Sequence, residues 1–131
     1  MTGLTPYLHF PGSTREALEF YQGAFGGDIH LNTYAEFNRT DGPAEAIAHG
    51  MLRGPVELYA ADAGPGDVPV NVQGVMFSLL GTAEPDELKA WFDALAVGGR
   101  ITAPLQQRPW GDYDGIVIDR YGITWLIGYE G

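Results

Sequence analysis

The 131-residue sequence contains no cysteine, which excludes disulfide bonds and thiolate metal sites. It also lacks any apolar run near the roughly 18 residues that span a bilayer, so a membrane is not an expected partner. The first residues show neither the basic region nor the apolar region of a signal peptide. Together these absences favour the cytoplasm as the location of the protein.

Basic residues are scarce, because 7 Lys and Arg stand against 17 Asp and Glu, for a formal charge of −10. Phosphate backbones repel such a surface and no Lys/Arg cluster counters it, so nucleic acid is not an expected partner. We interpret the charge as a source of solubility, with attraction of a cationic ligand as the alternative. The length and the hydrophobic fraction of 45% suit one globular domain over residues 1–131.

The clearest sign of internal organisation is a near-repeat. Residues 10–27 and residues 80–99 both run from an apolar strand through a glycine, a helical segment with paired aromatic residues, and a Gly-Gly pair. Two such segments indicate a duplicated module rather than two independent domains. The modules are predicted over residues 1–64 and 70–131, with a connection rich in glycine and proline at 63–69.

Each module is predicted to contain one helix. Ser13 and Glu16 have the spacing of a capping box, and Pro85 suits the first turn of the second helix. The two Gly-Gly pairs end the helices, because glycine readily adopts positive φ. The apolar stripes are interpreted as core rather than as a cofactor site; they comprise Leu18, Tyr21 and Phe25 in the first helix and Leu88, Trp91, Phe92 and Leu95 in the second.

The remaining segments are predicted to be strands, separated by tight turns at Gly54-Pro55 and Tyr121-Gly122. The resulting fold class is α+β, with two tandem βαβββ modules whose curved, partly open mixed sheet surrounds a central groove. The predicted strands are Leu4–Phe10, Asp28–Phe37, Glu45–Arg53, Val56–Asp62, Val72–Leu80, Ile101–Gln107, Gly115–Asp119 and Thr124–Tyr129.

Several strings in this order resemble the PhnB-like branch of the vicinal-oxygen-chelate (glyoxalase, bleomycin-resistance and dioxygenase) superfamily. The strings are Pro6–Phe10, Ala17–Tyr21 with Phe25-Gly26-Gly27, Ala48-His49-Gly50, Asp62, Trp110-Gly111 and Asp119–Trp125. The resemblance implies a sheet that holds a small ligand on its concave face, and often a homodimer. It does not imply one activity, since members include lyases, ring-cleaving dioxygenases, thiol transferases and antibiotic-sequestering proteins. Some relatives carry a 3-demethylubiquinone-9 3-methyltransferase label, which we do not adopt because no glycine-rich nucleotide loop follows a strand.

The resemblance also indicates where the metalloenzymes of this superfamily hold a divalent ion. Those positions correspond to Pro6, Glu57, Gly74 and either Trp125 or Leu126, and Glu57 alone offers a donor side chain. Gln73, one residue from Gly74, is a remote alternative donor. We therefore expect no metal at the usual site and no other cofactor. The alternative is a metal-dependent lyase, isomerase or dioxygenase with an atypical site.

Two residues are predicted to be catalytic. His49 lies in a strand that would direct it into the groove beside Ile47 and Met51, as a general base or a lone ligand. Its other interpretation is a core histidine bonded to a backbone carbonyl. Glu57 shares a strand face with Tyr59, where a carboxylate on an apolar wall suits proton abstraction. This face could instead meet solvent or a dimer partner.

Five aromatic residues are predicted to contact the ligand: Phe10, Tyr59, Trp110, Tyr113 and Trp125. Trp110 and Tyr113 lie in a loop rich in glycine and aspartate, and each offers a flat apolar surface with a polar edge. The alternative is that Trp110 plugs one end of the core.

The sequence favours a dimeric small-molecule-binding protein, acting by sequestration or as a cofactor-independent enzyme. A cation-binding resistance protein is a third possibility.

The other histidines and two aspartates are given structural interpretations. His9 alternates with Leu8 and Phe10, so it is predicted to face away from them, against a helix or outward. His30 is predicted to be exposed. Asp62 and Asp119 are predicted to order the connection and a hairpin turn, respectively.

Overall fold

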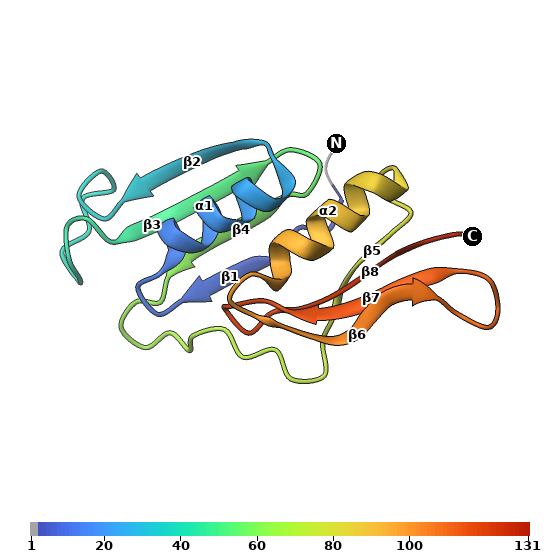
Figure 1. Ribbon diagram of the computed structural model, residues 1–131. Coiled ribbons are helices and arrows are strands. Elements are labelled where there is room, and N and C mark those ends of the chain that lie inside the picture. The colour runs from blue at the N-terminus through green and yellow to red at the C-terminus, as the bar shows by residue number, and fades with distance from the viewer. Residues whose placement is uncertain (1–2) are drawn as a thin grey trace. The chain divides into compact units, whose positions relative to one another are not determined.

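The computed structural model describes residues 3–131 and divides into two compact units, Met1–Val70 and Asn71–Gly131 (Figure 1). Each unit contains one βαβββ module, so the predicted α+β class and the duplication are confirmed. The chain order of the elements within each module is the same, and so is the order of the strands within each sheet.

Unit 1 contains one helix and a four-stranded sheet in the order β1-β4-β3-β2. Strand β1 runs parallel to β4, and the other neighbouring pairs are antiparallel. The elements are β1 (Tyr7–Phe10), α1 (Thr14–Phe25), β2 (Asp28–Thr33), β3 (Ile47–Arg53) and β4 (Leu58–Asp62).

Unit 2 repeats this arrangement with the sheet order β5-β8-β7-β6. Strand β5 pairs in parallel with β8, and β6, β7 and β8 are antiparallel neighbours. The elements are β5 (Phe77–Leu80), α2 (Pro85–Ala96), β6 (Arg100–Gln107), β7 (Tyr113–Ile118) and β8 (Thr124–Tyr129).

The strand predicted over Asp28–Phe37 is too long, because β2 ends at Thr33. Thr33 and Glu36 bond reciprocally: the Thr33 amide donates to Glu36 Oε1 at 2.9 Å, and the Glu36 amide donates to Thr33 Oγ1 at 3.2 Å. This capping-box spacing turns the chain, and the turn allows the Tyr34 ring to be buried. Strands β1, β3, β4 and β5 also begin later than predicted, and β6 and β7 begin earlier.

The N-terminus of α1 differs from the prediction, since the Ser13 side chain forms no capping bond. The carboxylate of Asp62, at the end of β4, accepts the capping hydrogen bond instead. Its Oδ1 accepts the Thr14 amide at 3.0 Å and its Oδ2 accepts the Ile47 amide at 2.9 Å. One carboxylate therefore joins the starts of α1 and β3. Pro85 occupies the first turn of α2, as predicted.

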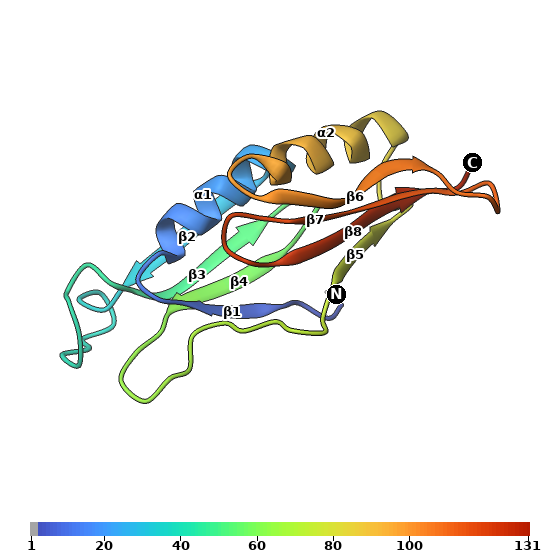
Figure 2. The ribbon, with the colours of Figure 1, turned by 60° about the horizontal axis from the view of Figure 1, so that its bottom comes forward.

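Each helix lies over one face of the sheet of its own unit, as Figures 1 and 2 show. The predicted stripes are confirmed as core, with all seven residues buried. A glycine lets each helix approach a central strand. A Cβ on Gly50 would lie 2.7 Å from Leu18 Cδ1 of α1, and one on Gly115 would lie 2.9 Å from Phe92 Cε2 of α2.

The alternation of side chains divides the sheet of unit 1 into two faces. Gly50 contacts α1, so its register partner Ala60, and Leu8 beside Ala60, also face α1. The neighbours of these residues along the strands face the opposite way. They are Tyr7 and His9 in β1, His49 and Met51 in β3, and Tyr59 and Ala61 in β4.

Candidate functional site

The sheet face of unit 1 opposite α1 carries a cluster of four aromatic rings, Tyr7, His9, His49 and Tyr59, which we name the Tyr–His cluster. Tyr7 lies at its centre, with ring centroids 5.4 Å from His9, 5.6 Å from His49 and 6.2 Å from Tyr59. His49 and Tyr59 are 5.7 Å apart. Three strands thus contribute to one aromatic surface.

A hydrogen bond joins Tyr7 to His49 across the sheet. The Tyr7 hydroxyl and His49 Nδ1 are 2.9 Å apart, although β4 separates β1 from β3. Ala61 occupies the β4 position between His9 and His49 in the register, and it is only 5% exposed. Because Ala61 is small, the Tyr7 side chain has room to reach the imidazole.

Tyr7, the central residue of the cluster, is a neutral partner of His49. A phenol is ordinarily protonated at neutral pH. Partial burial favours the protonated form further, because desolvation raises the pKa of the Tyr7 phenol above its ordinary value. The cluster offers flat apolar ring surface with polar edges, which is the character of many small-molecule sites.

Glu57 lies away from His49, so the structure does not bring the two predicted catalytic residues together. In the register of β3 and β4, His49 falls opposite Ala61, four residues from Glu57. At about 3.3 Å per residue this is about 13 Å along the strand. Glu57 instead follows the β3–β4 turn, and no hydrogen bond or ion pair joins its side chain to any of residues 3–131.

Of the five predicted ligand contacts, only Tyr59 belongs to the cluster. Phe10 and Trp125 are each 1% exposed on the helix-facing sides of their sheets. Tyr113 stacks on Tyr129 at 4.9 Å, on the α2 side of its sheet. Trp110 is 69% exposed in the connection between β6 and β7. These four residues lie outside the Tyr–His cluster.

Sequence reasoning missed Tyr7 and gave His9 no role. The signal was present, because Tyr7 and His9 alternate with the apolar Leu8 and Phe10 and must share the opposite face. His9 does face away from both, as predicted, and it lies opposite α1 rather than against the helix. His49 lies on the same face and is bonded to a tyrosine rather than to a backbone carbonyl.

The metal-ligand positions implied by the superfamily do not provide a donor set. Pro6 has no donor, Gly74 has a φ of 75° and no side chain, and Trp125 is buried on the α2 side of its sheet. Leu126 is apolar, which leaves Glu57 alone. Within residues 3–131, no three His, Asp or Glu side chains are grouped to hold a metal ion. These residues do not fit the usual metal.

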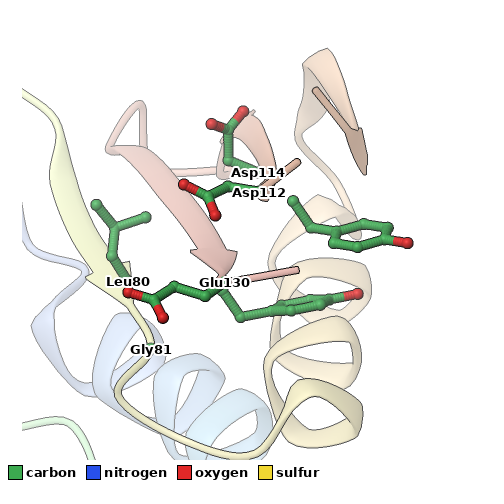
Figure 3. A pocket seen from close by; sticks show the side chains of 7 residues that line it. Leu80, Gly81, Asp112, Asp114 and Glu130 are labelled. Atoms are coloured by element: carbon green, nitrogen blue, oxygen red, sulfur yellow. The ribbon is translucent and has the colours of Figure 1, made fainter. Parts of the chain in front are cut away.

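Unit 2 contains an acidic cavity of about 540 Å³ at one end of its sheet. Figure 3 shows that Asp112 and Glu130 extend toward the same space as Leu80. Asp114 also lines the cavity, but the Arg108 guanidinium neutralises it at 2.6 Å. The uncompensated charge of the cavity therefore comes from Asp112 and Glu130.

No helix formed by residues 3–131 is both long enough and apolar enough to cross a membrane.

The sequence is similar to those of known proteins, and these similarities agree with the fold described above. Residues 4–127 match the family described as the Glyoxalase/Bleomycin resistance protein/Dioxygenase superfamily. Protein YjdN of Escherichia coli (strain K12) is 28% identical over 138 residues, which cover 95% of this chain and 92% of YjdN.

Solved structures extend this similarity. Protein PA1353 from Pseudomonas aeruginosa has a TM-score of 0.79 and 30% identity, with 99% of this chain and 98% of that chain covered. The PhnB protein from Bacillus cereus has a TM-score of 0.77 and 22% identity, with 98% and 99% covered, and supports the fold alone. The structural neighbours therefore include the PhnB-like proteins that the sequence resembles.

Proposed function

Because the chain belongs to the Glyoxalase/Bleomycin resistance protein/Dioxygenase superfamily, we propose that it binds a small organic molecule on the Tyr–His cluster, without the usual divalent metal. The observation that carries this proposal is the Tyr7–His49 hydrogen bond of 2.9 Å within a four-ring surface. The bond fixes two polar groups in position on an aromatic face. Such fixed polar groups orient a ligand that the rings hold by contact.

A ligand screen tests the proposal. Compounds would be ranked by the rise they cause in the melting temperature, and binding at about 100 times the Kd should stabilise the protein by about 2.7 kcal/mol. The rise should be lost or reduced in His49→Ala and Tyr59→Ala. It should persist in Trp110→Ala, which removes another exposed aromatic residue. Equal rises in all three variants would contradict binding at the cluster.

The cluster also supports two modes of action for the bound molecule. Sequestration needs only affinity, whereas a cofactor-independent enzyme would use the Tyr7–His49 pair to move a proton. The rival proposal is a metal-dependent enzyme built on His49 and Glu57. Their separation of about 13 Å along the strand argues against a shared ion, whose ligand bonds are about 2 Å long.

A second candidate function is binding of an organic cation, which the acidic cavity of unit 2 favours. Asp112 and Glu130 supply negative charge there, and the Tyr113 and Tyr129 residues lie at its border. A cationic glycopeptide of the bleomycin type would bind at low salt and lose affinity in Asp112→Asn or Glu130→Gln. No binding at low ionic strength would remove this candidate, since charge attraction is strongest there.

We also propose a cytoplasmic homodimer, on the basis of the resemblance to the superfamily. Light scattering coupled to size exclusion tests the oligomeric state directly. A mass of 14.2 kDa at all concentrations would identify a monomer and contradict the dimer.

A further inference from the structure

Resting on the proposed function, we infer that Tyr7 holds His49 in the tautomer that carries its proton on Nε2, which makes His49 a hydrogen-bond donor to the ligand. The chemical class that this site takes is then a neutral planar molecule with a carbonyl or amide oxygen. His49 acts as a donor in this scheme and not as the general base that the sequence suggested.

The direction of the Tyr7–His49 bond follows from the chemistry of its two partners. A phenol O–H is a better proton donor than a neutral imidazole N–H, and an imidazole nitrogen is a better acceptor than a phenol oxygen. Tyr7 also keeps its proton, as a phenol does at neutral pH, and burial raises its pKa further. The hydroxyl therefore donates to Nδ1 at 2.9 Å, which leaves the imidazole proton on Nε2.

The second nitrogen of His49 is the group left for a ligand. Nδ1 and Nε2 lie on different edges of the imidazole, so a bond to Tyr7 directs Nε2 away from Tyr7. None of residues 3–131 forms a hydrogen bond with His49 Nε2. A donor on an aromatic surface without a protein partner is satisfied by water or by an acceptor on a bound molecule.

The surroundings of His49 select a neutral acceptor over an anion. The residues beside it in the sheet are Asn32 on β2 and Ala61 on β4, and neither carries a charge. Arg53, the last residue of β3, directs its guanidinium to the Met51 sulfur at 3.9 Å, and no hydrogen bond within residues 3–131 joins a cationic side chain to His49. A carboxylate placed at Nε2 would lose hydration without gaining a cation, and the formal charge of −10 opposes it further.

Nitrogen NMR tests the tautomer without any ligand. In wild-type protein at about pH 8.5, where imidazoles are ordinarily neutral, His49 should show a protonated Nε2 and an unprotonated Nδ1 with the shift of a bonded acceptor. The His49→Gln variant identifies its signals. Tyr7→Phe keeps the ring but removes the hydroxyl, so the Nδ1 shift should move toward that of His30, which is exposed.

Tyr59→Phe is the matched control, because Tyr59 lies near His49 but no hydrogen bond joins the two. It should leave the His49 signals unchanged. A proton on Nδ1 in the wild-type protein would overturn the inference, as would a Nδ1 shift that is the same in wild-type and Tyr7→Phe proteins.

Three probes with one ring and different head groups test the ligand class: benzamide, benzoate and benzylammonium. Benzamide should bind most tightly, and His49→Phe should weaken it about three- to tenfold, which is the effect of one hydrogen bond. Benzoate should bind more weakly than benzamide. Benzylammonium has no acceptor, so its affinity should be the same in wild-type and His49→Phe proteins.

The outcomes separate this inference from the proposed function. If benzamide shifts signals of the Tyr–His cluster but binds equally to wild-type and His49→Phe proteins, the donor role is wrong and the binding site stands. If benzoate binds more tightly than benzamide, the neutral class is wrong. If none of the probes shifts any signal of the cluster, the proposed function itself fails.

Discussion

Replacing Gly99 by alanine should destabilise the protein by about 1–3 kcal/mol, because the new methyl group has no space. A Cβ at this position would meet the Ile118 carbonyl oxygen and would lie 2.9 Å from Asp119 Cα. Both are backbone atoms, and the Asp119 amide is held by a 2.9 Å bond to the Ile123 carbonyl. The hairpin would have to move as a unit, which is why the cost exceeds that of crowding a flexible side chain.

The cause of this loss can be isolated with two other glycines. Gly122 has a φ of 84° and nothing within 4 Å of an added Cβ, so Gly122→Ala reports the cost of positive φ alone, about 1–2 kcal/mol. Gly23 lies inside α1, and nothing lies within 4 Å there either. Gly23→Ala should stabilise the protein by about 0.5–1 kcal/mol, since alanine favours helix.

Urea unfolding followed by circular dichroism measures all three variants against wild type. We expect a lower urea midpoint for Gly99→Ala and Gly122→Ala and a higher one for Gly23→Ala. Gly99 has no positive φ, so a midpoint for Gly99→Ala equal to that of wild type would refute the crowding argument directly.

Three further predictions concern the buried turn, the cluster and the metal. Asp119→Asn should lower the free energy of unfolding in urea by about 1–3 kcal/mol. The Asn side chain has one acceptor oxygen, so it cannot accept both the backbone N–H groups that now bond to Oδ1 and the Trp125 Nε1–H that now bonds to Oδ2 at 2.9 Å. Unchanged stability would contradict this prediction. Because the pKa of Tyr7 is raised in the folded protein, its contribution to stability is present below about pH 10 and is lost as the pH rises through the folded-state pKa. The melting temperature should therefore fall less steeply above about pH 10 in Tyr7→Phe than in wild type. Chelator-treated protein titrated with nickel, zinc, manganese and ferrous iron should show no stoichiometric binding; binding lost in both His49→Ala and Glu57→Ala would restore the metal-dependent proposal.

Most of the fold was predictable because its signals are local. Pro85 and the Gly-Gly pairs mark helix boundaries whatever the surroundings, and the apolar stripes have a helical period. The prediction failed where two local signals compete. Tyr34 and Phe37 suit a strand by propensity, but the spacing of Thr33 and Glu36 forms a cap that turns the chain, so the strand ends at Thr33.

The candidate site was less predictable, because it depends on which strands become neighbours. The alternation of β1 indicates that Tyr7 and His9 share a face, but nothing in the sequence shows that Tyr7 reaches His49 across β4. That contact needs the register of two strand pairs and a small residue, Ala61, between them. Glu57 illustrates the converse, since its alternation with Tyr59 is visible in the sequence but its distance from His49 depends on the register of β3 and β4.

The two units show why one of them carries the Tyr–His cluster. They share element order and strand order, so duplication alone would give two equal faces. In unit 2 the sheet face opposite α2 combines aliphatic residues (Leu80, Ile116, Ile118 and Leu126) with the polar Ser78, Asp114 and Thr124, whereas all three histidines of the chain lie in unit 1. The face of unit 2 therefore has no imidazole that could donate a hydrogen bond to a ligand. We therefore expect a ligand with a polar acceptor group to bind the face of unit 1 more tightly than the face of unit 2. His49→Phe keeps the ring contact but removes the donor, so it should reduce this difference in affinity.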